Sequence, residues 1–472
     1  MHELPSAVLQ SFKQEVVSEM RVPKPPQKAQ VTGAGHHFDT ASGLSSQVDF
    51  GLGPTFLVYL HIVTCCLSLV FVAGFYAGLE IIQFDEIGLN AALLNVALFS
   101  LISVIFALTR FSFGYFLGFY FYTMILGYVW LVQFSRFNYD HLTADVSAFV
   151  SALAFVLPAL LVTSPIKQSY ILSARTLDIL QAAIMALAAI IIAVAGIYNF
   201  RLVSISAIYD FRDELEFPTW LRYAIGVESD ALLPFAFSWF VMRRKRWLAA
   251  AVLVLLLLFY PITLSKFALF APFWLLFLAL LSGLVEARTA VVMSLFLPLL
   301  IGVVLAGLTE LDLVPYSYVV DYFGIVNFRM VAIPSAALDL YGDFFSTHDL
   351  TYFCQISFLK AVVACPYSEP LAIIMRKAYG IGNLNASLFA TEGIASVGPI
   401  MTPLVVLACG FAASFANRLS SGLPPRFILL SAGTLPQLFL NVPLSITIAT
   451  HGASLVFLLW YLVPRSAFDE PE

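Results

Sequence analysis

Residues 179–200, ILQAAIMALAAIIIAVAGIYNF, decide the fold of this chain. The stretch has no charged side chain and matches the roughly 20 residues that an α-helix needs to cross a bilayer. Similar stretches recur along the 472 residues, of which 60% are hydrophobic and only 11% are charged, and the mean hydropathy is +0.91. Because such a chain cannot fold as a water-soluble globule, we predict an all-α, polytopic transmembrane helical bundle.

We expect about 12 spans in two groups. Residues 54–308 hold spans one to nine, residues 394–463 hold spans ten to twelve, and a long loop with its own helices lies between them at 309–393. Residues 1–53 and 464–472 are predicted to be tails. The apolar stretches are 54–79, 89–109, 111–132, 144–163, 179–200, 221–242, 247–264, 267–284, 289–308, 394–416, 427–446 and 448–463.

Basic residues set the expected orientation, because short loops rich in Lys and Arg stay on the cytoplasmic side of a membrane. The densest basic cluster, at 243–246, lies between the sixth and seventh spans. Placing this cluster inside puts both termini in the cytoplasm and the 309–393 loop outside. The reverse orientation, with the cluster in an external turn, is the less favourable alternative.

Cationic side chains gather at the predicted outer rim of the bundle. They are Arg222, Lys266, Arg329, Arg376 and Lys377. Each of them alone is compatible with a local ion pair or with snorkelling toward the headgroups. Together they indicate a site for a lipid-linked phosphate, because the planar arginine fork matches phosphate oxygens.

Several residues are candidates for acid–base chemistry. Glu392, where the tenth span opens, is either a base or a charge stabilised by the helix dipole at a helix N-terminus. Asp343 and His348 lie in the predicted outer loop. His348 and His451 are also candidates, although as lone histidines they are more typical of structural roles than of acid–base chemistry.

The sequence contains no pattern typical of a cofactor or metal site. The phosphate-binding loop, the nucleophile elbow and the His-Glu-x-x-His motif do not occur, and we expect neither a cofactor nor a nucleic-acid partner. Cys354 and Cys365 share the predicted outer loop, where they either form a disulfide in an oxidising exterior or remain free buried thiols.

Three stretches of the second half carry a resemblance through their order. The first is 223–234 followed by a basic turn, and the second is ITLSKFALFAP at 262–272. The third joins 328–334, FRMVAIP, and 341–345, YGDFF, to 383–386, NLNA, and 392–398, EGIASVG. In this order they resemble the oligosaccharide repeat-unit polymerases of bacteria, the Wzy class that builds O-antigen, capsule and exopolysaccharide.

The resemblance implies a GT-C-like fold and metal-independent glycosyl transfer on the periplasmic face of the bacterial inner membrane. Donor and acceptor would both be oligosaccharides linked to undecaprenyl diphosphate, in contact with membrane lipids, and a chain-length regulator and a flippase would be further partners. Arg376, Arg329 and Glu392 are then expected to be catalytic. The residues expected to bind substrate are Arg222, Lys266, Lys377, Tyr341, Asp343, Asn383, Asn385 and His348.

Two other functions are compatible with the same pattern. An O-antigen ligase would use the same lipid-diphosphate donor and pass the glycan to a lipid A core. A multi-pass transporter or flippase of lipid-linked glycan would suit the number of spans, and its charges would line a pathway at the middle of the membrane.

Overall fold

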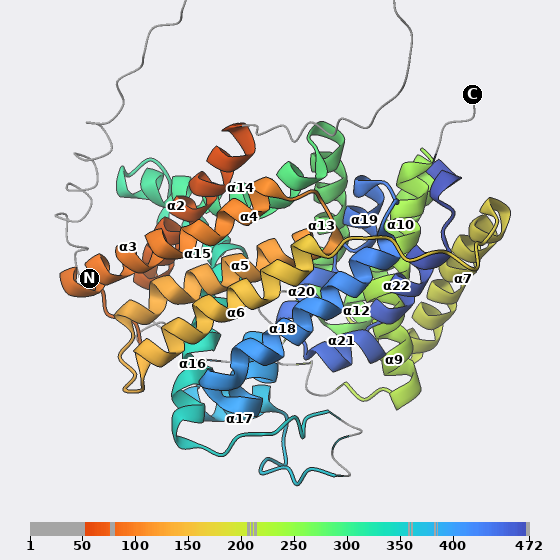
Figure 1. The fold of residues 1–472 in the computed structure, drawn as a ribbon. Helices are drawn as coiled ribbons and strands as arrows, with labels where there is room; N and C mark the ends of the chain where they lie inside the picture. Colours follow the sequence, from red (N-terminus) through yellow and green to blue (C-terminus); the bar gives the residue numbers. More distant parts are fainter. Residues whose placement is uncertain are drawn as a thin grey trace, which may run out of the picture. The chain divides into compact units, whose positions relative to one another are not determined.

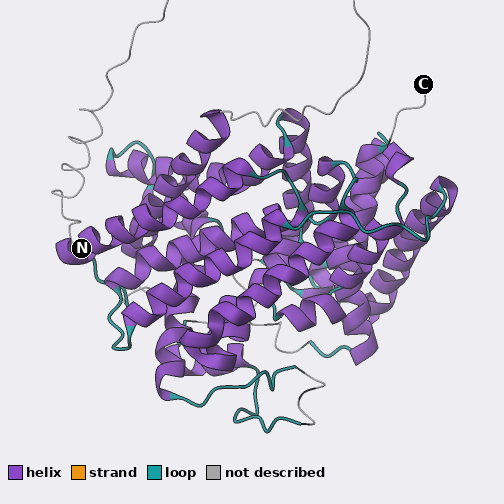
Figure 2. Cartoon of the chain, viewed as in Figure 1, coloured by secondary structure: helices purple, strands orange, loops and turns teal. Residues whose placement is uncertain are grey.

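The computed structural model describes residues 52–75, 81–204, 208, 211, 215–356, 359, 362–381, 384 and 386–468. This part of the chain is helical, and a single β-bridge joins Ile82 to Ser135 (Figures 1 and 2). Eleven of its helices are long and apolar enough to cross a membrane, and a twelfth span results if the bent pair α21 and α22 is counted as one. The predicted all-α polytopic bundle is confirmed. Nearly all of the tail expected at 1–53, and the end of the tail at 464–472, lie outside the described residues.

The membrane-length helices include several that consist of more than one element. The elements of the first half are α2 Leu52–Phe75, α3 Glu86–Ser100, η2 Leu101–Ser103, α4 Val104–Leu108, α5 Phe113–Leu131, η3 Val132–Phe134, α6 His141–Leu161, α7 Ala174–Tyr198, α9 Thr219–Val227, η4 Glu228–Leu232 and α10 Leu233–Met242. Those of the second half are α11 Arg246–Leu258, α12 Tyr260–Thr263, α13 Lys266–Leu284, α14 Ala287–Glu310, α15 Tyr316–Ile325, η5 Phe328–Ala332, α16 Ile333–Thr347, α17 Leu371–Tyr379, η7 Phe389–Ile394, α18 Ala395–Ser420, α19 Pro425–Ser431, α20 Leu435–Asn441, α21 Leu444–Thr450, α22 Ala453–Leu462 and η8 Arg465–Phe468.

Helix α5 forms the centre of the core, because every one of its residues is buried. A helix that is apolar on all sides is stable only when other helices surround it, and α5 packs against α2, α3, α6, α16 and α18. Two glycines permit the closest approaches. A Cβ at Gly114 would collide with the backbone of Ala159 in α6, and a Cβ at Gly127 would collide with Ser335 in α16.

A buried asparagine fixes α18 against the two central helices. The Asn417 side chain donates to the carbonyl oxygen of Ala159 at 2.6 Å and accepts from the backbone N–H of Gly114 at 2.6 Å. Because an unpaired amide in the interior costs on the order of 2 kcal/mol, these bonds favour a single register of α5, α6 and α18. The register matters because η7, which runs directly into α18, contributes Thr391 to the candidate site.

The residues predicted as the first part of the outer loop form a long helix instead. Tyr316–Thr347, which comprises α15, η5 and α16, is 32 residues long and meets the criteria for a membrane span. Its charged residues lower the hydropathy of the stretch, which is why the sequence assigns it to a loop. The structure tolerates Asp339 in the interior and Asp343 in a half-buried position, because both carboxylates accept hydrogen bonds from tyrosine hydroxyls.

The last two predicted spans differ from the sequence expectation in a similar way. Residues 425–462 form four short helices, α19 to α22, and α21 and α22 meet at an angle of 59°. Prolines account for the breaks, since Pro436 lies in the first turn of α20 and Pro443 directly precedes α21. Gly452, with a φ of 78°, forms the turn between α21 and α22.

Candidate functional site

A cavity of about 440 Å³ lies where α16, η7, α17 and α21 meet. Its walls combine hydroxyl, amide and carboxyl groups with aromatic rings, and a disulfide forms part of the lining. The residues are Tyr341, Thr351, Cys354, Gln355, Cys365, Tyr367, Ser368, Glu369, Pro370, Leu371, Ala372, Thr391, Asn441, Val442, Pro443 and Ile446. Tyr341 and Thr391 lie near the ends of two membrane-length helices, and the lining residues within 351–355 and 365–370 lie outside any of them, so the cavity is at one end of the bundle.

Glu392, which stands directly beside the cavity, is a positioning group in this structure. Its carboxylate accepts backbone N–H groups from Leu388 at 2.7 Å and from Leu444 at 2.5 Å, and only 6% of the residue is exposed. Leu444 is the first residue of α21, so Glu392 stabilises the N-terminus of that short helix. Of the two roles predicted for Glu392, the helix-terminal charge is the one that these contacts support, although the helix is α21 rather than its own.

A disulfide between Cys354 and Cys365 closes the outer wall of the cavity. Beside it, the side chain of Gln355 donates to the Ser396 hydroxyl at 2.9 Å, and the backbone N–H of Thr351 donates to the Ala395 carbonyl at 2.8 Å. These bonds attach the wall to the start of α18. Of the two alternatives that the sequence leaves open for these cysteines, the structure contains the disulfide.

Helix α17 brings two cations close to the cavity. Its first residues line the wall, and Arg376 and Lys377 follow on its last turn. The ammonium group of Lys377 lies 2.6 Å from the carboxylate of Glu369, which itself lines the cavity. Arg376 is exposed and has no ion-pair partner among the described residues. A guanidinium in this position is available to an anion.

A carboxylate network that includes the predicted residue Asp343 anchors this region, and its second member, Asp339, was not predicted from the sequence. In the network, Asp339 accepts hydrogen bonds from Tyr139 at 2.6 Å and from Ser135 at 2.7 Å, which attaches α16 to the loop between α5 and α6. Asp343, one turn further along α16, accepts from Tyr379 at 2.6 Å. Burial raises the pKa of both tyrosine hydroxyls above the ordinary value. The spacing of four between the two aspartates on one helix is the signal that would have pointed to them.

The remaining predicted cations are on other elements. Arg222 is on α9, Lys266 begins α13, and Arg329 is on η5; none of them lines the cavity. Arg329 and Asp343 share one long helix but are 14 positions apart, or about 21 Å at 1.5 Å per residue. The cavity is therefore not lined by the set of cations expected from the sequence.

Of the other predicted binding residues, Asn383 and Asn385 lie outside the described residues, and the ring of His348 packs on a neighbouring aromatic ring. The ring of His348 stacks on Phe344 with centroids 3.9 Å apart, and its Nδ1 lies 2.9 Å from the carbonyl oxygen of the same residue. His348 is exposed just beyond the end of α16, and Tyr341 is the predicted residue that lines the cavity directly.

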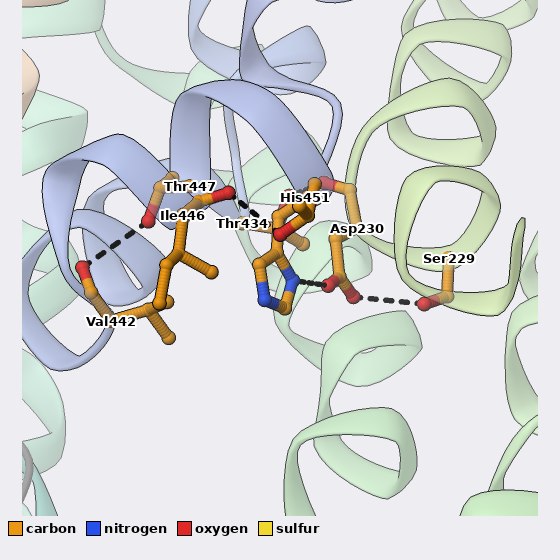
Figure 3. A network of polar contacts seen from close by, with 8 residues as sticks. Ser229, Asp230, Thr434, Val442, Ile446, Thr447 and His451 are labelled. Carbon is orange, nitrogen blue, oxygen red and sulfur yellow. Dashed lines mark hydrogen bonds and ion pairs between the residues drawn. The ribbon is translucent and has the colours of Figure 1, made fainter. Parts of the chain in front are cut away.

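A second polar cluster lies at the junction of α21 and α22 (Figure 3). His451 Nδ1 is 2.6 Å from Asp230 Oδ2, and the other carboxylate oxygen accepts from the Ser229 hydroxyl at 2.8 Å. Thr434 donates to the backbone carbonyl of Asp230 at 2.7 Å. The sequence treats His451 as a lone histidine, because Asp230 is more than 200 positions away.

Three π-helical turns coincide with stretches that carry the resemblance. The turn η4 holds Asp230, η5 holds Arg329, and η7 holds Glu392. A π-turn inserts one extra residue into a helix and so changes the direction of the side chains that follow, and such turns are frequent at functional sites. In these three stretches the chain therefore departs from regular α-helical geometry.

Compared with known proteins, the chain matches no family model, no curated protein and no solved structure. Within the described part of the chain, no group of three or more His, Cys, Asp or Glu residues is arranged to hold a metal ion. The functional argument therefore depends on the cavity and the polar clusters themselves.

Proposed function

We propose that this protein is a membrane glycosyltransferase that polymerises oligosaccharide repeat units carried on undecaprenyl diphosphate. The observation that carries the proposal is the cavity of about 440 Å³ at one end of the bundle. The half-buried ring of Tyr367 offers a face for stacking on a sugar ring, and Gln355, Glu369 and Asn441 offer the amide and carboxyl groups that bind sugar hydroxyls. A saccharide attached to a lipid diphosphate would present this chemistry at this depth.

The leaving group of such a transfer is a lipid diphosphate, on which negative charge grows as the glycosidic bond forms. Fixed cations lower the barrier by neutralising that charge. Arg376 suits this role, because it is exposed on the helix whose first turn lines the cavity and has no acidic partner among the described residues. Lys377 is a weaker candidate, since Glu369 already neutralises it.

The disulfide supports a location of the cavity on the periplasmic side of the bacterial inner membrane. Disulfides persist in oxidising compartments and are rare in the cytoplasm. Both cysteines are part of the cavity wall, so the cavity and the disulfide share one compartment. This agrees with the orientation inferred from the basic cluster at 243–246.

A second candidate function, transport of a lipid-linked glycan, is favoured by features at mid-helix. Glu228 is the tenth residue of the span Thr219–Met242, is 1% exposed, and neither of its carboxylate oxygens has a hydrogen-bond partner among the described residues. Broken helices such as α21 and α22 line the binding sites of many transporters. The cavity at the end of the bundle, rather than at mid-helix, favours the enzyme.

The test uses the purified full-length protein in lipid nanodiscs. The donor is the lipid-linked oligosaccharide extracted from source cells in which the chromosomal copy has been deleted. A ladder of products on a gel is expected. A single product that appears only when lipid A core is added would indicate a ligase, and donor that crosses liposome membranes without any new product would indicate a transporter; either result would overturn the proposal.

A further inference from the structure

We propose that His451 is the general base of the reaction and that Asp230 positions it. This inference rests on the glycosyl transfer proposed above. Asp230 is 9% exposed at the side chain and engages one ring nitrogen of His451, whose side chain is 28% exposed (Figure 3). A buried carboxylate paired with a half-open imidazole is the arrangement by which hydrolases and transferases activate a hydroxyl group.

The hydrogen bond to Asp230 determines which ring nitrogen is available. A carboxylate oxygen accepts, so Nδ1 carries the hydrogen and the lone pair is on Nε2. Nε2 has no hydrogen-bond partner among the described residues, and it is the atom that would take a proton. A hydrogen bond that only connected the two helices would not require Nε2 to be free of a partner. The unpaired state of Nε2 within the described part of the chain is therefore the feature that favours a catalytic role.

The surroundings hold the pair in one geometry. Ser229 and Thr434 fix the carboxylate and the backbone of Asp230, respectively. Gly452 brings the junction of α21 and α22 against η4, because a Cβ at this position would lie 2.7 Å from the Cβ of Ala231. Gly226, one turn before Asp230, packs closely beside the pair: a Cβ there would be in van der Waals contact with His451 Nδ1, at 3.6 Å.

Helix α21 connects this pair to the cavity. Its N-terminus is held by Glu392, its residue Ile446 lines the cavity, and the backbone N–H of His451 donates to the Ile446 carbonyl at 3.3 Å. His451 follows the end of α21 and lies five positions beyond Ile446, a helical rise of about 7.5 Å. We therefore place the acceptor end of a saccharide bound in the cavity beside the C-terminal end of α21.

The acceptor hydroxyl gives its proton to His451 Nε2 while its oxygen forms a bond to the anomeric carbon of the donor. The bond between that carbon and the diphosphate oxygen breaks, and undecaprenyl diphosphate leaves with the electron pair. The imidazolium, stabilised by the Asp230 carboxylate, then returns its proton to water. No oxidant, reductant or further reactant is needed.

The test compares variants that separate the structural effect of the hydrogen bond between His451 and Asp230 from the action of His451 as a base. His451→Asn keeps a donor near the position of Nδ1, and therefore the bond to Asp230, but has no basic nitrogen. We expect it to lower the rate of ladder formation at least 100-fold, within the range for loss of a general base, while thermal unfolding and binding of undecaprenyl diphosphate stay at wild-type values. Ser454→Ala, which removes a hydroxyl bonded to Ile448 at the same junction, is the matched control and should leave the rate unchanged.

The inference is overturned if His451→Asn forms ladders at the wild-type rate. If His451→Asn lowers the thermal unfolding temperature, His451→Ala with added imidazole decides the question: recovery of ladder formation supports the base, and its absence contradicts it. Failure of the proposed function would look different, because the wild-type protein itself would then produce no ladder.

Discussion

The hydroxyl of Tyr379 donates to the carboxylate of Asp343 at 2.6 Å and so fastens the last turn of α17 to the last turns of α16. The contact matters because α17 carries Arg376 and Lys377, whereas α16 carries Tyr341 on the cavity wall. Tyr379 also packs edge to face against Phe137, with ring centroids 5.6 Å apart. One side chain thereby sets the distance between the cations and the cavity.

Tyr379→Phe should lower activity without unfolding the bundle. The substitution keeps the ring and its packing but removes the bond to Asp343, which costs about 1 kcal/mol of local stability and leaves Arg376 less well positioned. We expect a roughly 10-fold slower rate of ladder formation, with the unfolding temperature of the whole protein nearly unchanged. A wild-type rate in this variant would show that the position of α17 is unimportant.

The attachment of α17 should also weaken in alkali. Burial and the Asp343 carboxylate raise the pKa of the Tyr379 hydroxyl above its ordinary value, so the folded protein keeps this proton where the unfolded chain releases it. The stabilising contribution is complete below about pH 10 and is lost as the pH rises further. Limited proteolysis of α17 should therefore accelerate above about pH 10. In Tyr379→Phe the same pH step should have a smaller effect, and equal acceleration in both proteins would contradict the assignment.

Substitution of Glu392 should reveal a structural role. In Glu392→Gln one carboxylate oxygen becomes an NH₂ group, which faces a backbone N–H of Leu388 or Leu444 and leaves it unpaired. We expect a loss of about 1–3 kcal/mol in stability, together with a loss of activity. Thermal unfolding in detergent and ladder formation should fall together. Full stability with abolished activity would instead favour the base predicted as one role for Glu392.

The disulfide should be required for an intact cavity. In the chain-entropy picture, closing a loop between Cys354 and Cys365 stabilises the folded wall by about 3 kcal/mol. The double variant Cys354→Ser, Cys365→Ser should lose most ladder formation, and a reductant should inhibit the wild type but not alter the variant further. A membrane-impermeant maleimide applied to reduced spheroplasts should label these cysteines. Labelling only after the membrane is opened would reverse the proposed orientation.

Sequence patterns were sufficient to predict the bundle, because hydropathy reports burial in lipid directly. They were insufficient at the long helix Tyr316–Thr347 and at α19 to α22. In the first case the charges of Asp339 and Asp343 lower the hydropathy, and the hydroxyl groups that donate hydrogen bonds to them come from elsewhere in the chain, namely Tyr139 and Tyr379. In the second case the apolar run is continuous, and hydropathy does not register prolines that divide it into short helices.

The same limitation applies to the candidate site. Tyr341, Lys377 and Arg376 could be predicted from residue type and position, and they do lie at or near the cavity. The pairing of His451 with Asp230 joins segments more than 200 positions apart, so no local pattern contains it. The sequence predicts Arg222, Lys266 and Arg329 beside Arg376, because all four are expected to face the same side of the membrane. In the structure these residues are on four different elements.

Loss of the positive charge at Arg376 should slow ladder formation more than loss of the positive charge at Lys377. Arg376→Ala removes a guanidinium that has no acidic partner among the described residues, whereas Lys377→Ala removes an ammonium group already paired with Glu369 at 2.6 Å. If Arg376 neutralises the departing diphosphate, Arg376→Ala should slow ladder formation about 100-fold, and Arg376→Lys should recover part of the rate because it restores the charge without the fork. Lys377→Ala should slow it less than 10-fold. Binding of undecaprenyl diphosphate, measured in nanodiscs, should weaken in the same order. Equal effects of the two alanine variants would mean that the diphosphate is held elsewhere, with Arg222 and Lys266 as the next residues to test.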